Sequence, residues 1–433
     1  MSYRAFPAYK ESGVPWLGQI PEHWSAWRFS HAVSVNGGQV DPRLAPWSEM
    51  TLIAPNHIES GTGRLLATET AAEQGADSGK YLIRKGQVIY SKIRPALRKA
   101  TLAPADCLSS ADMYGLHPVA GLMREQFLLE VVLSKPFTDF VIDASMRVAM
   151  PKINREALGA GTVCFPSLEE QDAILAFLDR ETAQIDELIA KQNALIELLG
   201  ERRKAVVSRA VTKGLDPAVE MKDSCVEWLG RVPAHWELSP IKWVASLTTG
   251  ITPPSLDPGN YSDEPDGFPW MRPEDLDETG KPSVATKRLT TAGASYIRRL
   301  PASAVLVCAI GATLGKIGIT DSWAATNQQI TAITRFDVPK YLFYALSAGR
   351  QAIVTASVGN TLPILNNERL GTIAIPCPPV PERLAIVNFL NPAVDQIGIV
   401  IQKAQQAVAL LRERRSALIT AAVTGKIDVR GEA

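Results

Sequence analysis

The residues of this chain that could form a catalytic centre do not complete any known motif. Gly311 to Lys316 reads Gly-Ala-Thr-Leu-Gly-Lys. A phosphate-binding loop needs one more residue before the Gly-Lys pair and a Ser or Thr after it, where this chain has Ile317. The acid-x-lysine triplet from Glu220 to Lys222 lacks the upstream Pro-Asp that a metal-dependent nuclease would supply. We therefore interpret the glycine turn as a backbone feature that presents Thr313 and Lys316.

Methyl transfer and metal chemistry are no better supported. A base methyltransferase needs a glycine-rich cofactor loop and an Asn-Pro-Pro-aromatic motif, and the closest approach is Asn391-Pro392-Ala393-Val394. The five histidines show no metal-ligand spacing. The five cysteines are an odd, scattered set, which favours a reducing cytoplasm over disulfides or zinc. We predict no catalytic residue, no metal ligand and no cofactor on this chain.

Basic residues are concentrated in two stretches without acidic residues, although Lys plus Arg and Asp plus Glu balance at 45 each over the whole chain. Locally unopposed charge favours phosphate binding, because counterion release supplies much of the affinity for nucleic acid. Planar and amide side chains that can read base edges lie nearby. The predicted DNA-binding residues are Lys80, Arg84, Lys92, Arg94, Arg98, Lys99, Arg272, Lys287, Arg288, Thr313, Lys316, Asn327 and Gln328. A solvated basic face without a ligand is the alternative for either stretch alone.

These residues lie on a chain that repeats itself. A shift of 212 positions carries Trp16, Leu17 and Gly18 onto Trp228, Leu229 and Gly230. The same shift later aligns Pro151 to Gly159 with Pro363 to Gly371 and Glu201 to Arg203 with Glu413 to Arg415. A duplicated unit predicts two similar lobes related by a pseudo-twofold axis, a form suited to a ligand with two halves.

The register changes inside each copy. Val88, Leu97 and Lys99 align with Val305, Leu314 and Lys316 at an offset of 217. The copies therefore share a framework but differ in their loops, and we expect them to recognise different things.

Each copy ends in a long segment with helical periodicity. From Ile174 to Val206, ten positions follow one another at alternating steps of four and three, and seven of them are apolar. The equivalent positions from Ile386 to Leu418 follow the same pattern, and nine of them are apolar. This is the seam of a coiled coil. Glycine and proline interrupt these segments only at Gly200, Pro392 and Gly398. We expect the two helices to pair with each other in antiparallel fashion, although packing of each helix on its own domain is the alternative.

The sequence thus predicts an α+β protein with α/β-type recognition domains, two long antiparallel helices and an internal duplication. Short apolar runs bounded by turn residues predict strands in each domain, and 126–142 and 340–354 predict helices. The predicted segments are domain 1 at 1–166, spacer helix 1 at 167–214, domain 2 at 215–379 and spacer helix 2 at 380–428.

Several motifs, in their order and duplication, resemble the specificity subunits of type I restriction-modification systems. The resemblance rests on Val14 to Gly18 with Pro21 to Trp24 and their repeat Glu227 to Trp236, on Phe268 to Leu276, Gly311 to Lys316 and Thr326 to Gln328, and on Pro378 to Arg383, Arg414-Arg415 and Thr424 to Asp428. The first copy departs from the pattern. It has Lys92 to Lys99 in place of the glycine turn and lacks the Asn-Gln pair.

The resemblance implies a noncatalytic subunit whose two target recognition domains insert loops into the major groove at the two halves of a split, asymmetric double-stranded DNA target. The paired helices would act as a ruler for the spacer. Two modification subunits, which carry the S-adenosylmethionine chemistry, and restriction subunits, which use ATP and Mg²⁺, would dock on this chain.

Two other function classes remain open at the level of the sequence. One is a self-contained DNA modification enzyme with an unrecognised motif, and the other is a two-lobed scaffold that binds a symmetric protein. No signal-peptide run and no uninterrupted membrane-length apolar stretch is found, so we expect no membrane association and a cytoplasmic location.

Overall fold

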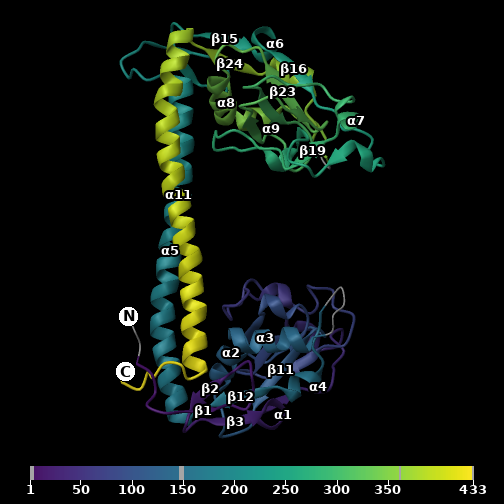
Figure 1. Cartoon of the computed structure of the whole chain (residues 1–433), viewed down its shortest axis with the longest axis vertical. Coiled ribbons are helices and arrows are strands. Elements are labelled where there is room, and N and C mark those ends of the chain that lie inside the picture. The colour runs from purple at the N-terminus through teal and green to yellow at the C-terminus, as the bar shows by residue number, and fades with distance from the viewer. Residues whose placement is uncertain (1–3, 146–150, 360–361, 432–433) are drawn as a thin grey trace. The chain divides into compact units, whose positions relative to one another are not determined.

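The computed structural model describes residues 4–145, 151–359 and 362–431. The chain divides into two compact units, each built from one mixed domain and parts of two long helices (Figure 1). Unit 1 comprises Met1–Gln192 and Gln406–Ala433, and unit 2 comprises Asn193–Gln405.

The domain of unit 1 contains two four-stranded sheets. The first is antiparallel, with the order β4 (Val33–Val35), β11 (Met113–Pro118), β8 (Val88–Ser91) and β9 (Ala100–Leu102). The second has the order β6 (Glu69–Thr70), β5 (Thr51–Ile53), β10 (Cys107–Ser109) and β7 (Tyr81–Ile83), and its β5 and β10 run parallel. Two antiparallel pairs complete it: β1 (Tyr9–Glu11) with β2 (Gln19–Pro21), and β3 (Ser25–Arg28) with β12 (Thr162–Phe165).

The domain of unit 2 repeats this plan. Its antiparallel sheet has the order β16 (Ser246–Thr249), β23 (Ile330–Thr334), β20 (Val305–Cys308) and β21 (Ile317–Ile319). Its mixed sheet has the order β17 (Tyr261–Ser262), β19 (Lys287–Leu289), β18 (Phe268–Met271) and β22 (Ala325–Thr326), with β18 and β22 parallel. The pairs are β13 (Met221–Asp223) with β14 (Arg231–Pro233) and β15 (Glu237–Pro240) with β24 (Ala374–Cys377).

Short helices pack beside the strands of the two sheets or against one another. They are α1 (Phe29–Ala32), α2 (Glu125–Leu133), α3 (Lys135–Ala144) and α4 (Arg155–Ala160) in unit 1, and α6 (Ile241–Val244), α7 (Thr291–Ala294), α8 (Pro339–Ala348), α9 (Arg350–Thr355) and α10 (Asn367–Thr372) in unit 2. The helices expected at 126–142 and 340–354 are each two helices. Extended backbone at Ser134 separates α2 from α3, and Gly349 separates α8 from α9.

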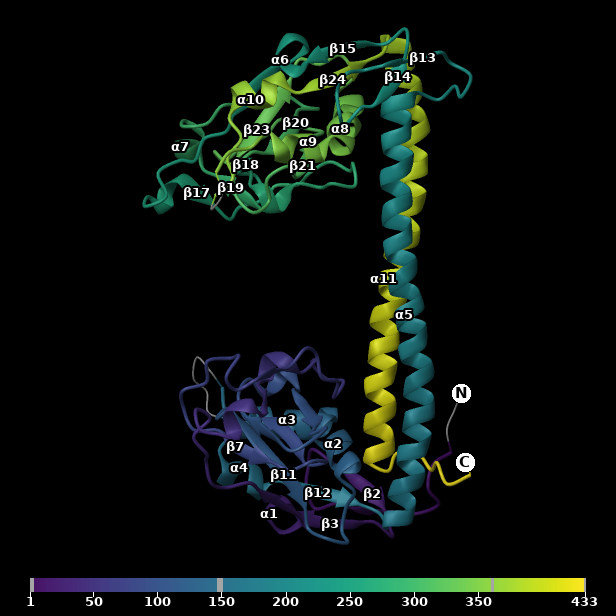
Figure 2. The same cartoon turned by 180° about the vertical axis from the view of Figure 1, so that it is seen from behind.

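The two long helices are α5 (Leu168–Lys213) and α11 (Val380–Val423), and Figures 1 and 2 show them running side by side within each unit. In unit 1, the start of α5 shares a core with the end of α11: Ile174, Phe177, Leu178, Leu418, Ile419 and Ala422. In unit 2, the end of α5 shares a core with the start of α11: Val207, Ala210, Val211, Ile386, Val387 and Leu390. The helices are therefore antiparallel, and the fold class predicted from the sequence is confirmed.

The predicted seam is not buried along its whole length. Ile174, Leu178 and Ile185 are buried, whereas Leu188 is 47% exposed and Leu195 is 38% exposed. Ile174 and Leu178 lie where α5 also packs with residues of the domain of unit 1, such as Phe127. A seam residue covered by one partner helix alone keeps part of its surface, so the heptad pattern overestimates burial away from the domains.

Helix α11 is long and apolar enough to cross a membrane by length and composition. Some of its apolar side chains have protein partners. Ile386, Leu390 and Val394 belong to the core of unit 2, and Leu418 and Ile419 to the core of unit 1. This packing accounts for only part of the hydropathy of the helix, because 22% of its most apolar window is buried.

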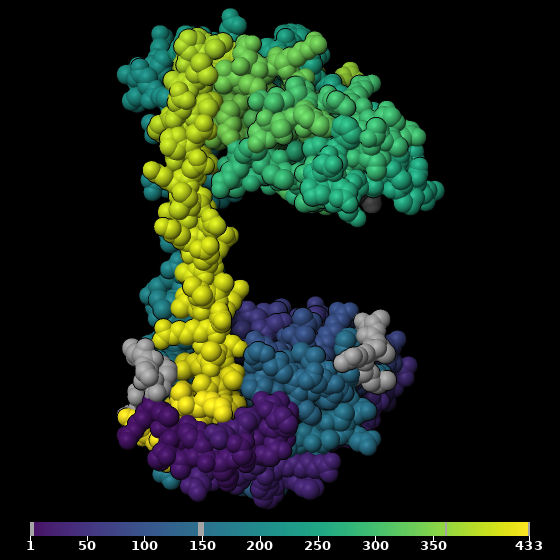
Figure 3. Space-filling model, in the orientation of Figure 1, coloured from purple at the N-terminus to yellow at the C-terminus, as the bar shows by residue number. Residues whose placement is uncertain are grey.

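The segment before each domain is anchored to the first turn of a long helix. In unit 1, His23 Nε2 lies 2.8 Å from Glu170 Oε2, and Trp24 Nε1 donates to Glu170 Oε1 at 3.0 Å. In unit 2, His235 Nε2 lies 2.8 Å from Glu382 Oε2. The 212 register therefore recurs as the same histidine-glutamate contact. The space-filling view shows the first residues of unit 1 packed beside the end of α11 (Figure 3).

Candidate nucleic-acid interface

The loop that follows the third strand of each antiparallel sheet occupies the same place in both units. In unit 1 this loop joins β8 to β9 and forms the bridge Ile93↔Lys152. In unit 2 it joins β20 to β21 and forms the bridge Ile310↔Ile364. Residues 93 and 310 are related by the offset of 217, and residues 152 and 364 by the offset of 212. Each bridge therefore pairs a residue from the 217 alignment with one from the 212 alignment.

A lysine fixes the end of this loop in both units. Lys99 Nζ donates to the Pro55 carbonyl at 2.7 Å, and Lys316 Nζ donates to the Pro273 carbonyl at 2.9 Å. Both lysines were predicted to bind DNA. Their ammonium groups bind carbonyls in the turns that follow β5 and β18 of the mixed sheets, and they thereby tie the two sheets of each domain together.

Two positions in this loop have left-handed backbone conformations in both units. Arg94 (φ 47°) corresponds to Gly311 (φ 89°), and Arg98 (φ 45°) corresponds to Gly315 (φ 80°). Glycine adopts this conformation freely, whereas a residue with a Cβ loses about 1 kcal/mol. Unit 1 therefore holds two arginines where the backbone favours glycine.

Three further predicted cations of unit 1 are engaged within the fold. Lys80 is buried and its Nζ donates to Ser78. Arg84 pairs with Asp106 at 2.7 Å. Arg98 Nη1 donates to the Leu133 carbonyl and to Ser416 Oγ on α11.

Lys92 and Arg94 are the predicted cations of unit 1 that face solvent without an ion pair in the described part of the chain. Lys92 Nζ lies 5.5 Å from the centre of the Tyr114 ring. Arg94 is exposed, and its guanidinium makes no hydrogen bond to any residue that the structure describes.

In unit 2, some of the predicted DNA-binding residues are likewise engaged within the fold, and others are exposed. Arg272 pairs with Glu274 at 2.8 Å, and Arg288 Nη1 donates to the Gly267 carbonyl. Thr313 Oγ1 lies 3.2 Å from Cys308 Sγ. Asn327 is buried and bonded to Gln329, whereas Lys287 and Gln328 are exposed. Gln328 Oε1 accepts from the Thr252 hydroxyl.

Two cations that sequence reasoning missed lie beside Lys92 and Arg94. Lys152 is exposed and bridges to Ile93. Arg155, at the first position of α4, donates to the Asn36 carbonyl and lies over the rings of Tyr81 and Tyr114. No signal in the sequence places this segment beside the β8–β9 loop, and the Ile93↔Lys152 bridge shows this contact only in the structure.

We call Lys92, Arg94, Lys152 and Arg155 the cationic edge of unit 1. By the two offsets, the matching residues of unit 2 are Ala309, Gly311, Ile364 and Asn367. None of them is charged. Asn367 is engaged internally, since its Oδ1 accepts from Thr249 and Thr331. Ile364 is 41% exposed and lies close in sequence to the exposed Leu362.

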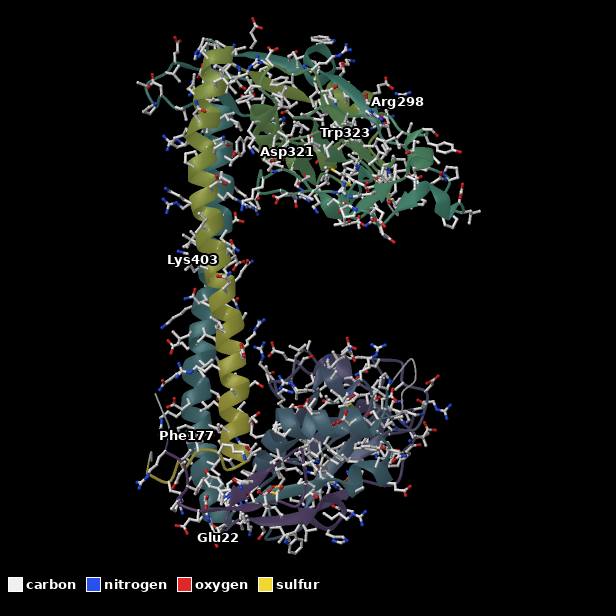
Figure 4. All side chains as sticks on the ribbon, viewed as in Figure 1. Glu22, Phe177, Arg298, Asp321, Trp323 and Lys403 are labelled. Carbon is white, nitrogen blue, oxygen red and sulfur yellow. The ribbon has the colours of Figure 1, made fainter. Side chains whose placement is uncertain are left out.

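The described residues offer little material for catalysis. They include no group of three or more His, Cys, Asp or Glu side chains placed to hold a metal ion. Burial raises the pKa of the Cys107 and Cys164 thiols to about 12, which keeps them protonated at neutral pH. In unit 2, the guanidinium of Arg299 lies over the ring of Trp323, which is labelled in Figure 4, at 5.2 Å from the ring centre.

Unit 2 also contains a cavity of about 630 Å³, lined by residues of α5, α8 and α9 and by Glu278 and Thr279. At the corresponding place in unit 1, Arg98 reaches from the β8–β9 loop to α11. Gly315 has no side chain to do the same in unit 2. Arg350 crosses to Glu278 at 2.6 Å at the rim of this cavity.

Comparison with known proteins points to one family. Residues 233–408 match the type I restriction modification DNA specificity domain. The chain is 34% identical over 209 residues to the type I restriction enzyme EcoDI specificity subunit of Escherichia coli, a match that spans 47% of this chain and 46% of the relative. The chain thus covers about half the length of that relative.

Two further matches extend over nearly the whole chain. The type I restriction enzyme MjaX specificity subunit of Methanocaldococcus jannaschii is 23% identical over 96% of both chains. A solved chain from work on complex assembly and conformational transition of the type I R-M system superposes with a TM-score of 0.72 at 18% identity and covers 93% of this chain and 98% of the other. The structural match shows a shared fold. In its sequence, the chain is thus similar to specificity subunits of type I restriction-modification systems, over residues 233–408 for the family model and over nearly the whole chain for one relative.

Proposed function

We propose that this chain is the DNA-recognition subunit of a type I restriction-modification complex and reads an asymmetric target in two parts. One observation carries the proposal. The two units share the strand order of their antiparallel sheets, the position of the loop and the lysine anchors, yet the cationic edge of unit 1 holds four cations and the matching positions of unit 2 hold none. A duplicated frame with unlike loops suits a DNA target with two unlike halves.

The proposed role is noncatalytic, with the chemistry supplied by partner subunits that bind S-adenosylmethionine or ATP and Mg²⁺. The long helices offer a surface for such partners. Leu198, Ile399 and Leu410 are 68%, 51% and 66% exposed. Exposed apolar residues on a helix pair support docking of modification and restriction subunits there. Such a complex would act on DNA in the cytoplasm.

DNA retention by the purified full-length chain tests the proposal. We expect replacement of Lys92, Lys152 and Lys287 by alanine to weaken binding and to reduce the slope of log affinity against log salt concentration by about two to three, because each phosphate contact contributes about 0.9. The control replaces three exposed lysines of the long helices, Lys191, Lys204 and Lys403 (Figure 4). Equal losses in both variants would contradict a DNA face on the domains.

The proposed ruler role of the helices has its own test. Insertion of seven residues into α5 and seven into α11 adds about 10 Å to each helix and keeps the heptad phase. Methylation profiling of a host that carries the system should then show a longer spacer between unchanged half-sites. An unchanged spacer would rule out the ruler.

A further inference from the structure

The cationic edge of unit 1 contains one side chain whose placement the fold does not explain. Arg94 and Arg98 both have left-handed backbone conformations in which unit 2 has glycine. The guanidinium of Arg98 gains two hydrogen bonds, one of them to α11, which offset the backbone cost. The side chain of Arg94 forms no hydrogen bond within the described residues that would offset this backbone cost.

The backbone around Arg94 is held firmly. Its N–H donates to the Pro151 carbonyl at 2.8 Å, and its own carbonyl accepts from Leu97 N at 2.9 Å. The adjacent Ile93 pairs with Lys152, and the N–H of Ile153 donates to the Lys92 carbonyl. The side chain of Arg94 therefore projects into solvent from a fixed base.

Two of the other three cations of the edge are oriented by aromatic rings. Lys92 and Arg155 both lie over Tyr114, at 5.5 Å and 5.6 Å from the ring centre, and Arg155 also bonds to the Asn36 carbonyl. These groups offer fixed positive charge around Arg94, as phosphate contacts on either side of a groove require. Within the described ranges, no residue hydrogen-bonds the guanidinium of Arg94, so its paired N–H donors remain available to a ligand.

We propose that Arg94 is a base-reading residue that gives unit 1 a preference for guanine in its half of the DNA target. Arginine donates two parallel hydrogen bonds to guanine O6 and N7 in the major groove, and no other base offers two acceptors there. Strained backbone held by its surroundings is a feature of functional sites. Gly311 leaves unit 2 without this contact, so the two half-sites differ at the matching position. This inference rests on the proposed function.

The test selects DNA duplexes from a randomised pool with the full-length chain and compares the wild type with Arg94→Gly. This variant adopts the residue of unit 2, so it should fold with an unchanged or slightly higher melting temperature. We expect a guanine in one half-site of the wild-type motif. The variant should lose that preference and bind the wild-type duplex about tenfold to a hundredfold more weakly, with the other half-site unchanged.

Lys152→Ala is the matched control, since it removes a neighbouring exposed cation. It should weaken binding on all sequences and reduce the salt slope by about one without changing the motif. The inference is overturned if Arg94→Gly keeps the wild-type motif, or if it behaves as Lys152→Ala does. A wild-type chain that retains no duplex from the pool would instead overturn the proposed function.

Discussion

Unit 1 and unit 2 have similar backbones, but different side-chain contacts connect their domains to the long helices. In unit 1, Glu170 lies near both His23 and the indole of Trp24, and Arg98 ties the β8–β9 loop to α11. In unit 2, Glu382 contacts His235 alone, Trp236 Nε1 has no hydrogen-bond partner among the described residues, and Gly315 replaces the arginine. Duplication has therefore kept the backbone plan while the polar contacts to the long helices diverged. Three experiments test whether this difference has energetic consequences.

The largest difference is expected at the glutamates. Glu170→Ala should lower the free energy of unfolding by about 3 kcal/mol, because it leaves the fully buried Trp24 indole without its acceptor and removes the contact with His23. Glu382→Ala should cost about 1 kcal/mol, because only one contact with an exposed histidine is lost. Denaturant unfolding of both variants measures this. Equal losses would show that the indole contact adds no stability.

A smaller difference concerns Glu130 on α2, an acid with no acidic counterpart at the matching position of unit 2. Burial raises the pKa of Glu130 to about 7 from its ordinary value of 4.5; Arg415 opposes the rise and Asp179 adds to it. Counted from the first residue of each helix, the matching position on α8 of unit 2 is Tyr344, whose hydroxyl donates to Asn391 at 2.9 Å. Because the folded state holds the Glu130 proton more tightly than the unfolded state, its contribution to stability is full below pH 4.5 and is lost as the pH rises through 7.

Glu130→Gln should remove this dependence. We expect the variant to be more stable than the wild type at pH 8, by about 2 kcal/mol, and to differ little at pH 4.5. Thermal melts at both pH values provide the measurement, and Tyr344→Phe serves as the control in unit 2, with no comparable pH dependence. A wild-type advantage at pH 8 would mean that the carboxylate is ionised and paired in the fold.

The smallest effect separates the two left-handed arginines. Arg98→Gly relieves backbone strain but removes two hydrogen bonds, so we expect a net loss of about 1 kcal/mol. Arg94→Gly relieves the same strain and removes no internal bond, so its stability should be unchanged or up to about 1 kcal/mol higher. Parallel unfolding of the two variants makes the comparison. A loss at Arg94 equal to that at Arg98 would reveal an internal role for Arg94.

The arrangement of helices and strands could be predicted from the sequence because the sequence contains an internal duplication. The 212 and 217 offsets correctly placed Lys99 opposite Lys316 and Val88 opposite Val305, and the heptad pattern identified both long helices. Repetition and periodicity are local signals, and they survive when a single chain is all that is available.

Side-chain partners could not be predicted in the same way. Arg84 seemed unopposed because Asp106 lies 22 residues away in the sequence. The carbonyls bound by Lys99 and Lys316, those of Pro55 and Pro273, lie about 44 residues earlier in the sequence, so the sequence did not show these internal contacts. The density of charge along a sequence does not show which cations the fold neutralises. The left-handed backbone at Arg94 likewise cannot be seen in the sequence. The predicted DNA contacts remain predictions at residue level.

The division of the chain also sets an order of assembly. Unit 2 is one uninterrupted stretch, Asn193–Gln405, whereas the core of unit 1 around Trp24 and Phe177 is completed by residues from Leu418 to Val429 near the other end of the chain. During synthesis from the amino terminus, the second-made half can therefore finish folding first. The earlier half must wait, with the apolar surface of its core uncovered, until the ribosome has released the last turns of α11.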